Sequence, residues 1–294
     1  MQPSRRAFLL GRRPAQSPWA AFLQRLGLLC QGAVRDLGED AGAGPRALLV
    51  PARDADVAHA RALCAEHRVV LALDGAEGPF DTSHGPVLRV DPSAMAGLAR
   101  LSGGMPRWRA QPGVPLAALA QAGLRQFAGL PGAMTLAEWL AAPARWAAGR
   151  CADSGVLTVD AMLADGVEET LGPFGEADVQ PLRSVTVQRL VPALFQLASG
   201  GDAFATRDGE RWLGRYRLDA LKPEAPATVN LAHLLLGHGG TLAWVQGVTL
   251  ADVPPAAQPA PAAEPPGLAT TRLDSRVKAL FDPDGRFPSL RAAQ

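Results

Sequence analysis

The most distinctive group of residues for chemistry is a glycine-rich tetrapeptide, G-H-G-G at 237–240. Apolar spacing predicts a short helix over 230–236 and an alternating strand over 241–250, so the glycines fall in the connection between them. Because glycine has no Cβ, the backbone here can come close to a bound cofactor. A glycine cap at the end of the helix, followed by a tight turn, is the simpler interpretation of the same residues.

Two further glycine-rich segments adjoin predicted strands. The first, D-G-A-E-G at 74–78, follows a buried strand predicted over 69–73. The second, G-R-C-A-D-S-G at 149–155, leads into a predicted strand. Arg150 is the one basic residue of the second segment.

Other chemistry has little support in the sequence. His59 and His67 lie on one predicted helix, but helical rise separates them by about 12 Å, too far to share one metal ion. We therefore expect no metal site, and the catalytic residues stay unassigned. Cys30, Cys64 and Cys151 are odd in number and widely spaced. That pattern argues against a disulfide framework and favours a reducing compartment.

The composition is that of a globular protein of one large or two small domains. Lys and Arg number 29 against 28 acidic residues, so bulk charge does not favour nucleic acid or an anionic membrane. No apolar run approaches the roughly 20 residues that a membrane-spanning helix requires. Segment 4–9 reads S-R-R-A-F-L and is similar to a twin-arginine export motif. Arg12 and Arg13 interrupt its apolar stretch, so we expect a cytoplasmic protein, with export as the alternative.

The predicted elements mix strands and helices along the chain, which indicates an α+β fold. Short apolar or alternating runs predict strands over 45–51, 69–73, 87–90, 108–111, 155–163, 169–172 and 241–250. Helical spacing predicts helices over 19–29, from 54 onward, and over 116–124, 187–198, 230–236 and 273–281. The Pro/Ala-rich segment 254–266 reads as a semi-extended linker.

Several of these segments, in this order, resemble the FAD-linked oxidases of the vanillyl-alcohol oxidase/p-cresol methylhydroxylase superfamily, in particular the relatives of glycolate and D-lactate dehydrogenase. Residues 45–74 are similar to that family's opening strand, helix and strand. The other similar segments are Q-P-G-V at 111–114, D-A-M-L-A-D-G at 160–166, G-R-Y-R-L-D-A-L at 214–221, N-L-A-H-L-L-L-G-H-G-G-T-L-A-W-V at 230–245 and V-K-A-L-F-D-P-D-G-R-F at 277–287.

This resemblance implies the PCMH-type FAD-binding fold, built from two α+β subdomains. It places a leader and short helix at 1–44, the FAD-binding domain at 45–253 with subdomains 45–130 and 131–253, and a linker with a last helix at 254–294. It also implies non-covalent FAD in a cleft between 74–78 and 237–245, with backbone N–H groups of the segment 74–78 bound to the diphosphate. The segment 149–155 takes the place of the family's second glycine-rich stretch, so the resemblance makes Arg150 the candidate phosphate or ribose contact, and a solvated loop arginine is the alternative. The residues implied to bind the cofactor are Asp74, Gly75, Gly78, Arg150, Gly155, Gly237, Gly239, Gly240 and Val245.

The chain departs from the family pattern in two ways. The family's phosphate loop usually reads R-G-G/H-G-T-S, whereas this chain has Asp74 and Glu77 there and no basic residue. At about 4 Å, one such carboxylate would cost roughly 4 kcal/mol against a phosphate charge at an effective dielectric near 20. Relatives also carry a cap domain that supplies substrate-binding groups, and the segment after Val253 is too poor in large apolar residues to form one.

Two functions remain open at this stage. One is a flavoprotein, an FAD-dependent oxidoreductase acting on a CH–OH donor or the FAD-binding subunit of a glycolate or D-lactate dehydrogenase-like complex. Its substrate domain would then come from a partner subunit. The other is a non-catalytic relative without flavin that keeps the fold as an assembly or structural subunit. The altered loop at 74–78 favours the second function, and the turn at 237–240 favours the first.

Overall fold

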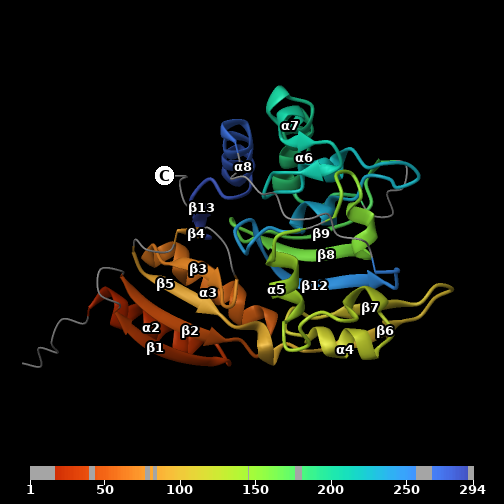
Figure 1. The fold of residues 1–294 in the computed structure, drawn as a ribbon. Coiled ribbons are helices and arrows are strands. Elements are labelled where there is room, and N and C mark those ends of the chain that lie inside the picture. The colour runs from red at the N-terminus through yellow and green to blue at the C-terminus, as the bar shows by residue number, and fades with distance from the viewer. Residues whose placement is uncertain are drawn as a thin grey trace, which may run out of the picture.

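The chain is seen here as a computed structural model that describes residues 17–39, 44–76, 80–81, 85–144, 146–175, 181–255 and 267–290. Figure 1 shows two lobes, each built around one β-sheet. The first sheet has four strands in the order β1-β2-β5-β3, and the second has five in the order β6-β7-β12-β8-β9. The α+β class expected from the sequence is confirmed. The twin-arginine-like motif, Gly78 and most of the Pro/Ala-rich segment lie outside the described residues.

The first lobe consists of the N-terminal helices and strands. Its elements are α2 (Pro18–Leu29), β1 (Ala33–Glu39), β2 (Pro45–Val50), α3 (Asp54–His67), β3 (Val70–Leu73) and β5 (Val87–Val90). Strands β2, β5 and β3 are parallel, and β1 pairs with β2 in the antiparallel sense. The helices bury their apolar faces against this sheet around Phe22, Leu49 and Leu88. Parallel strands that are covered in this way read as the continuous apolar runs noted in the sequence.

Asp56 fixes the start of α3 to the neighbouring chain. Its buried carboxylate accepts hydrogen bonds of 2.9–3.0 Å from the backbone N–H groups of Gln31, Gly32 and Ala52. Burial would raise the pKa of this carboxyl group, but these hydrogen bonds outweigh burial and lower it. Asp56 therefore connects the start of α3 to the segment that precedes β1 and to Ala52, which lies just after β2. Its negative charge also suits the N-terminal end of the helix.

The second lobe is larger and entirely antiparallel in its main sheet. Its strands are β6 (Leu98–Leu101), β7 (Arg107–Ala110), β8 (Val156–Leu163), β9 (Glu168–Leu171) and β12 (Ala243–Ala251), with a separate hairpin of β10 (Arg207–Asp208) and β11 (Arg211–Trp212). Its helices are α4 (Leu116–Gln121), α5 (Leu136–Ala141), α6 (Val185–Ala198), α7 (Gly201–Ala205) and α8 (Leu268–Phe281). The core of this lobe forms between the sheet and α6, α8 and the short 3-10 helix Leu231–Leu235.

The chain passes from the first sheet to the second between residues 90 and 98. β5 ends at Val90 in the first sheet, and β6 begins the second sheet at Leu98. The reason is a long-range pairing: β7 bonds to β12, with Ala110 opposite Val248. The early strand β7 therefore belongs to the second sheet, because it pairs with the late strand β12.

The C-terminal segment joins the lobes. Helix α8 packs in the second lobe through Leu273, Val277 and Phe281. The chain then crosses to the first lobe, where Leu71 donates a backbone hydrogen bond of 2.9 Å to Arg286 and Phe287 enters the core. Strand β13 (Ser289–Leu290) finally pairs with β4 (Phe80–Asp81). Figure 1 shows this crossing between α8 and the β4–β13 pair.

Candidate functional site

The candidate site lies where the glycine-rich turn of the second lobe meets β3 of the first. After the 3-10 helix Leu231–Leu235, the turn places Gly237, Gly239 and Gly240 at φ values of 80°, 65° and 70°. Residues other than glycine rarely adopt this left-handed backbone conformation. A Cβ on Gly240 would lie 3.0 Å from the Cβ of Leu73. The structure therefore brings the turn against the end of β3, beside Asp74, as the two segments of the predicted cleft require.

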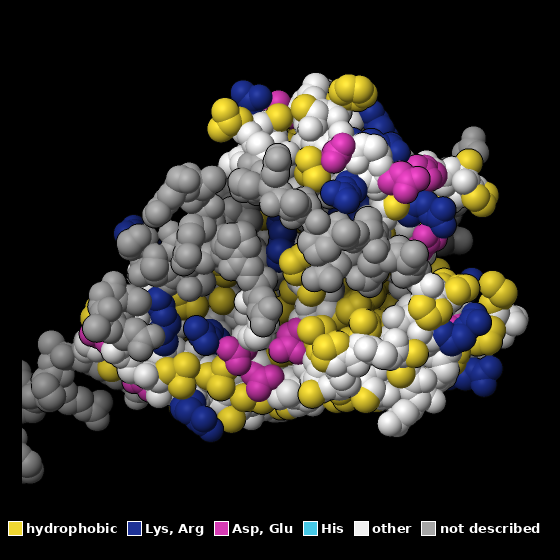
Figure 2. Space-filling model, viewed as in Figure 1, with side chains coloured by type: hydrophobic (Ala, Val, Ile, Leu, Met, Phe, Trp, Pro, Cys, Tyr) yellow, Lys and Arg dark blue, Asp and Glu magenta, His cyan; other side chains and the backbone are white. Residues whose placement is uncertain are grey.

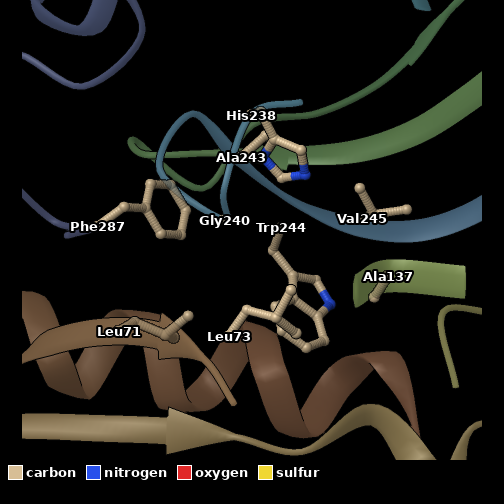
Figure 3. Close-up of a pocket in the computed structure, with 9 residues that line it drawn as sticks. All are labelled: Leu71, Leu73, Ala137, His238, Gly240, Ala243, Trp244, Val245 and Phe287. Atoms are coloured by element: carbon tan, nitrogen blue, oxygen red, sulfur yellow. The ribbon is translucent and has the colours of Figure 1, made fainter. Parts of the chain in front are cut away.

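A small cavity lies between these segments. It is lined by Leu71 and Leu73 of β3, Ala137 of α5, His238, Gly240, Ala243, Trp244 and Val245 of the second lobe, and Phe287 of the C-terminal segment. Figure 3 shows the ring of His238 on one side of it and the indole of Trp244, which points toward Leu73, on the other. Its volume is about 10 Å³, which is room for about one water molecule.

Two buried side chains at this cavity carry unsatisfied polar atoms. Neither ring nitrogen of His238, nor the indole Nε1 of Trp244, has a hydrogen-bond partner within the described part of the chain. Burial, helped by the nearby Arg215 charge, lowers the pKa of His238 to about 3. The imidazole is therefore neutral at physiological pH, with one donor and one acceptor nitrogen. Buried groups without partners are uncommon and mark strain or a bound molecule.

Among the described residues of the turn after β3, 74–76, none is basic. Asp74 forms an ion pair with Arg89 at 3.6 Å. Gly75 has a φ of 77°, and a Cβ built on it would lie 2.1 Å from Oε1 of Glu138. A second carboxylate therefore lies against the backbone of this turn, in addition to Asp74. Figure 2 shows acidic side chains gathered near the centre of this face of the molecule, with Lys or Arg side chains beside them.

Two backbone donors of the glycine turn are engaged within the protein. Gly237 donates a hydrogen bond of 2.7 Å to the carbonyl oxygen of Leu140, and Gly239 donates one of 3.1 Å to that of Ala141. Both acceptors lie at the end of α5. The N–H groups that would otherwise be available to a diphosphate thus hold the turn against this helix.

Arg150 and Gly155 lie elsewhere. Gly155 has a φ of 74° and its carbonyl accepts a hydrogen bond from Ala251, at the far end of β12. At about 3.3 Å per residue, the length of β12 separates Gly155 from the cavity by roughly 25 Å. Arg150 pairs with Asp153 at 2.9 Å and is half exposed. These two residues do not line the cavity, whereas Gly240 and Val245 do.

FAD does not fit this arrangement. The glycine turn and the unpartnered nitrogen atoms of His238 and Trp244 would suit a bound ligand. Three observations, however, argue against the binding of a dinucleotide. The cavity has the volume of about one water molecule, the N–H groups of Gly237 and Gly239 are engaged, and the carboxylate of Glu138 lies at Gly75. In the described part of the chain, the side chains of Leu73 and Trp244 line this cavity and the carboxylate of Glu138 lies at Gly75.

Glu138 and Trp244 were not among the site residues predicted from the sequence. Glu138 belongs to a capping box with Thr135, a T-x-x-E pattern that is visible in the sequence and would have located α5. Trp244 carries no such signal, because its position between the lobes depends on the pairing of β12. Across the described residues, no cluster of His, Cys, Asp or Glu is arranged to hold a metal ion.

A buried polar frame supports the turn from behind. The hydroxyl groups of Tyr216 and Thr241 are 2.7 Å apart. Asp274 of α8 accepts the backbone N–H groups of Arg215 and Tyr216 at 3.0 and 3.2 Å. Burial raises the pKa of Asp274 to about 6, against the effect of these hydrogen bonds. This frame fixes α8 to the segment that leads into the turn.

Comparison with known proteins gives matches at the level of structure. No protein-family model matches the chain, and neither does any curated protein. The xylooligosaccharide oxidase from Myceliophthora thermophila C1, solved with xylobiose, is 15% identical over 79% of this chain and 43% of its own, with a TM-score of 0.46. The 4-ethylphenol oxidase from Gulosibacter chungangensis is 12% identical over 82% of this chain and 43% of its own, with a TM-score of 0.47.

A VAO-type flavoprotein from Myceliophthora thermophila C1 is 14% identical over 70% of this chain and 32% of its own, with a TM-score of 0.39. The chain thus spans less than half the length of these solved proteins. In the part of the chain that is described, no helix is long and apolar enough to cross a membrane. The chain is similar in structure to VAO-type flavoprotein oxidases, at low identity and over part of their length.

Proposed function

We propose that this chain has the PCMH-type FAD-binding fold but no functional flavin site, and that it serves as a structural or assembly subunit of an oxidoreductase complex. The fold assignment is supported by the collinear motifs over 45–287 and by the meeting of β3 and the segment 238–245 at one cavity. The loss of the cofactor is supported by one observation above all. The cavity lined by Leu73 and Trp244 has a volume of about 10 Å³, and the carboxylate of Glu138 lies against the turn at Gly75.

The visible spectrum of the purified protein tests this proposal. We expect a colourless protein whose melting temperature does not change when FAD is added. Saturation with a ligand at a hundred times its Kd stabilises a protein by about 2.7 kcal/mol, which for a chain of this size corresponds to roughly 5–10 °C. A yellow protein, or a shift of that size with FAD, would overturn the proposal.

A partner subunit is the second part of the proposal. Oxidation of a CH–OH donor by a flavin enzyme requires a base near the reacting carbon and groups that bind the substrate. The described residues that line the cavity do not provide these groups, because His238 is the one titratable side chain among them. Mild purification from the native source, followed by mass measurement of the intact assembly, should show this chain in a complex that contains a separate catalytic polypeptide.

Flavin binding by an opened cleft is the second candidate. It is favoured by the unpartnered nitrogens of His238 and Trp244 and by the left-handed glycines of the turn. In that case the lobes would have to separate and the chain would be the FAD-binding subunit of a dehydrogenase-like complex. The same spectrum and melting experiment distinguishes the two candidates, because only this one predicts bound FAD.

A further inference from the structure

We infer that Glu138 and Trp244 are the two residues that exclude a dinucleotide from this fold, Glu138 at the polar end of the cleft and Trp244 at its apolar end. This inference rests on the proposed function, since it identifies the side chains responsible for the absence of a cofactor site. It extends the proposal because it predicts that binding can be gained by removing them.

Glu138 fills the polar end. Its Oε2 accepts hydrogen bonds from the N–H of Thr135 at 2.6 Å and from the Thr135 hydroxyl group at 3.0 Å, so the carboxylate is held in one orientation. Its other oxygen, Oε1, then lies 2.1 Å from the point that a Cβ on Gly75 would occupy. The negative charge is thus fixed directly beside the backbone of the turn after β3. An anionic ligand at that turn would meet both a steric block and a like charge.

Trp244 fills the apolar end. Its strand, β12, is the central strand of the second sheet, yet its indole packs in the core of the first lobe with Leu71, Leu73 and Ala137. Figure 3 shows the indole next to Leu73, on the far side of the cavity from the ring of His238. The side chain is 3% exposed. A planar bicyclic group of the chain itself therefore occupies the space between the lobes.

The two ends are separable, because Glu138 contacts the turn at Gly75 and Trp244 contacts the side chains of β3. Removing the carboxylate should free the backbone of the turn for a phosphate group. Removing the indole should free a flat apolar space beside the nitrogen atoms of His238, which then gain a possible partner. Each change should admit one part of a dinucleotide, and both together should admit the whole.

The experiment uses the full chain and five variants. Glu138→Gly is tested with ADP, Trp244→Gly with riboflavin and adenosine, and the double variant with FAD. Glu168→Gly and Trp212→Gly serve as controls, because they remove the same side chains from strands outside the cavity. Equilibrium dialysis gives the dissociation constants, and melting with and without ligand gives an independent readout. Circular dichroism establishes that each variant is folded. Trp244→Leu, with a smaller apolar side chain, replaces the glycine variant if that one does not fold.

We expect each cleft variant to bind its probe at least tenfold more tightly than the wild type or its control, and the double variant to bind FAD. Folded cleft variants that bind no better than the wild type would overturn the inference and leave the proposed function standing. FAD binding by the wild type would instead overturn the proposed function. The two failures are therefore distinguishable.

Discussion

The ammonium group of Lys278 donates a hydrogen bond of 2.8 Å to the carbonyl oxygen of Thr241, the residue that follows the glycine turn. It also pairs with the buried carboxylate of Asp282 and reaches the carbonyl oxygen of Phe287 at 3.4 Å. Burial lowers the pKa of Lys278, and Asp282 opposes that effect. One cation thus connects α8, the turn of the second lobe and the segment that enters the first.

Replacing Lys278 should lower the stability of the folded protein. Lys278→Met leaves the carboxylate of Asp282 buried without its counter-charge, and we expect the free energy of unfolding to fall by about 3–5 kcal/mol. Arg272→Met on the same helix removes an exposed pair with Asp202 and should cost less than about 1 kcal/mol. Urea unfolding of both variants measures the difference. Equal losses would show that Lys278 contributes no more than a surface residue.

His238 should make the protein sensitive to acid. Its pKa is about 3 in the folded state and about 6.5 when unfolded, so its contribution to stability is present above pH 6.5 and is lost as the pH falls toward 3. Between pH 7 and pH 5, the wild type should lose about 2 kcal/mol more than His238→Leu. The exposed His59→Leu serves as the control. Parallel pH dependence of the wild type and His238→Leu in denaturant unfolding would contradict the assignment.

Gly240 should tolerate no side chain. Gly240→Ala combines a φ of 70° with a Cβ contact of 3.0 Å to Leu73, whereas Gly285→Ala has a φ of 63° and open space around it. The second variant isolates backbone strain, which costs about 1–2 kcal/mol. We expect Gly240→Ala to lose at least about 1 kcal/mol more than Gly285→Ala. If thermal melting shows equal losses, the turn does not pack against β3 as closely as described.

The cysteines should be unreactive in the folded protein. Cys30, Cys64 and Cys151 are free and buried. Burial raises the pKa of all three thiols, that of Cys30 to about 11. At pH 8 the nucleophilic thiolate is therefore scarce as well as inaccessible. Mass spectrometry should find no alkylation by iodoacetamide until denaturant is added, and then three modified residues. Rapid labelling of Cys30 in the native protein would refute this.

Much of the fold could be predicted from the sequence where an apolar run has clear ends. β2, β3 and β5 lie within one residue of their predicted bounds, because prolines and glycines terminate short buried runs. β1 was missed, since almost every residue of this edge strand is exposed and no alternation is visible. β6 was missed for the same reason. Local pattern also could not assign β7 to the second sheet, because that depends on β12.

The candidate site was predictable only in part. The turn at 237–240 and its proximity to the end of β3 followed from the motifs, and the structure places Gly240 against Leu73. The filling of the cleft did not follow. Trp244 faces the first lobe, whereas Ala243 and Val245 belong to the core of the second, so the alternation of β12 decides which side chain enters the cleft. Side-chain direction in a strand depends on register, which distant residues set.

The central place of β12 has a consequence for synthesis of the chain. In the sheet formed by the described residues, the β6–β7 pair and the β8–β9 hairpin flank this strand, which ends at Ala251. Both pairs leave the ribosome long before β12 does, and until then each has an unpaired edge where β12 will insert. Pairings of such high sequence separation form slowly, and open edges can associate with other chains. The nascent second lobe is thus vulnerable to aggregation until its last strand arrives, and a chaperone bound before that point would protect it.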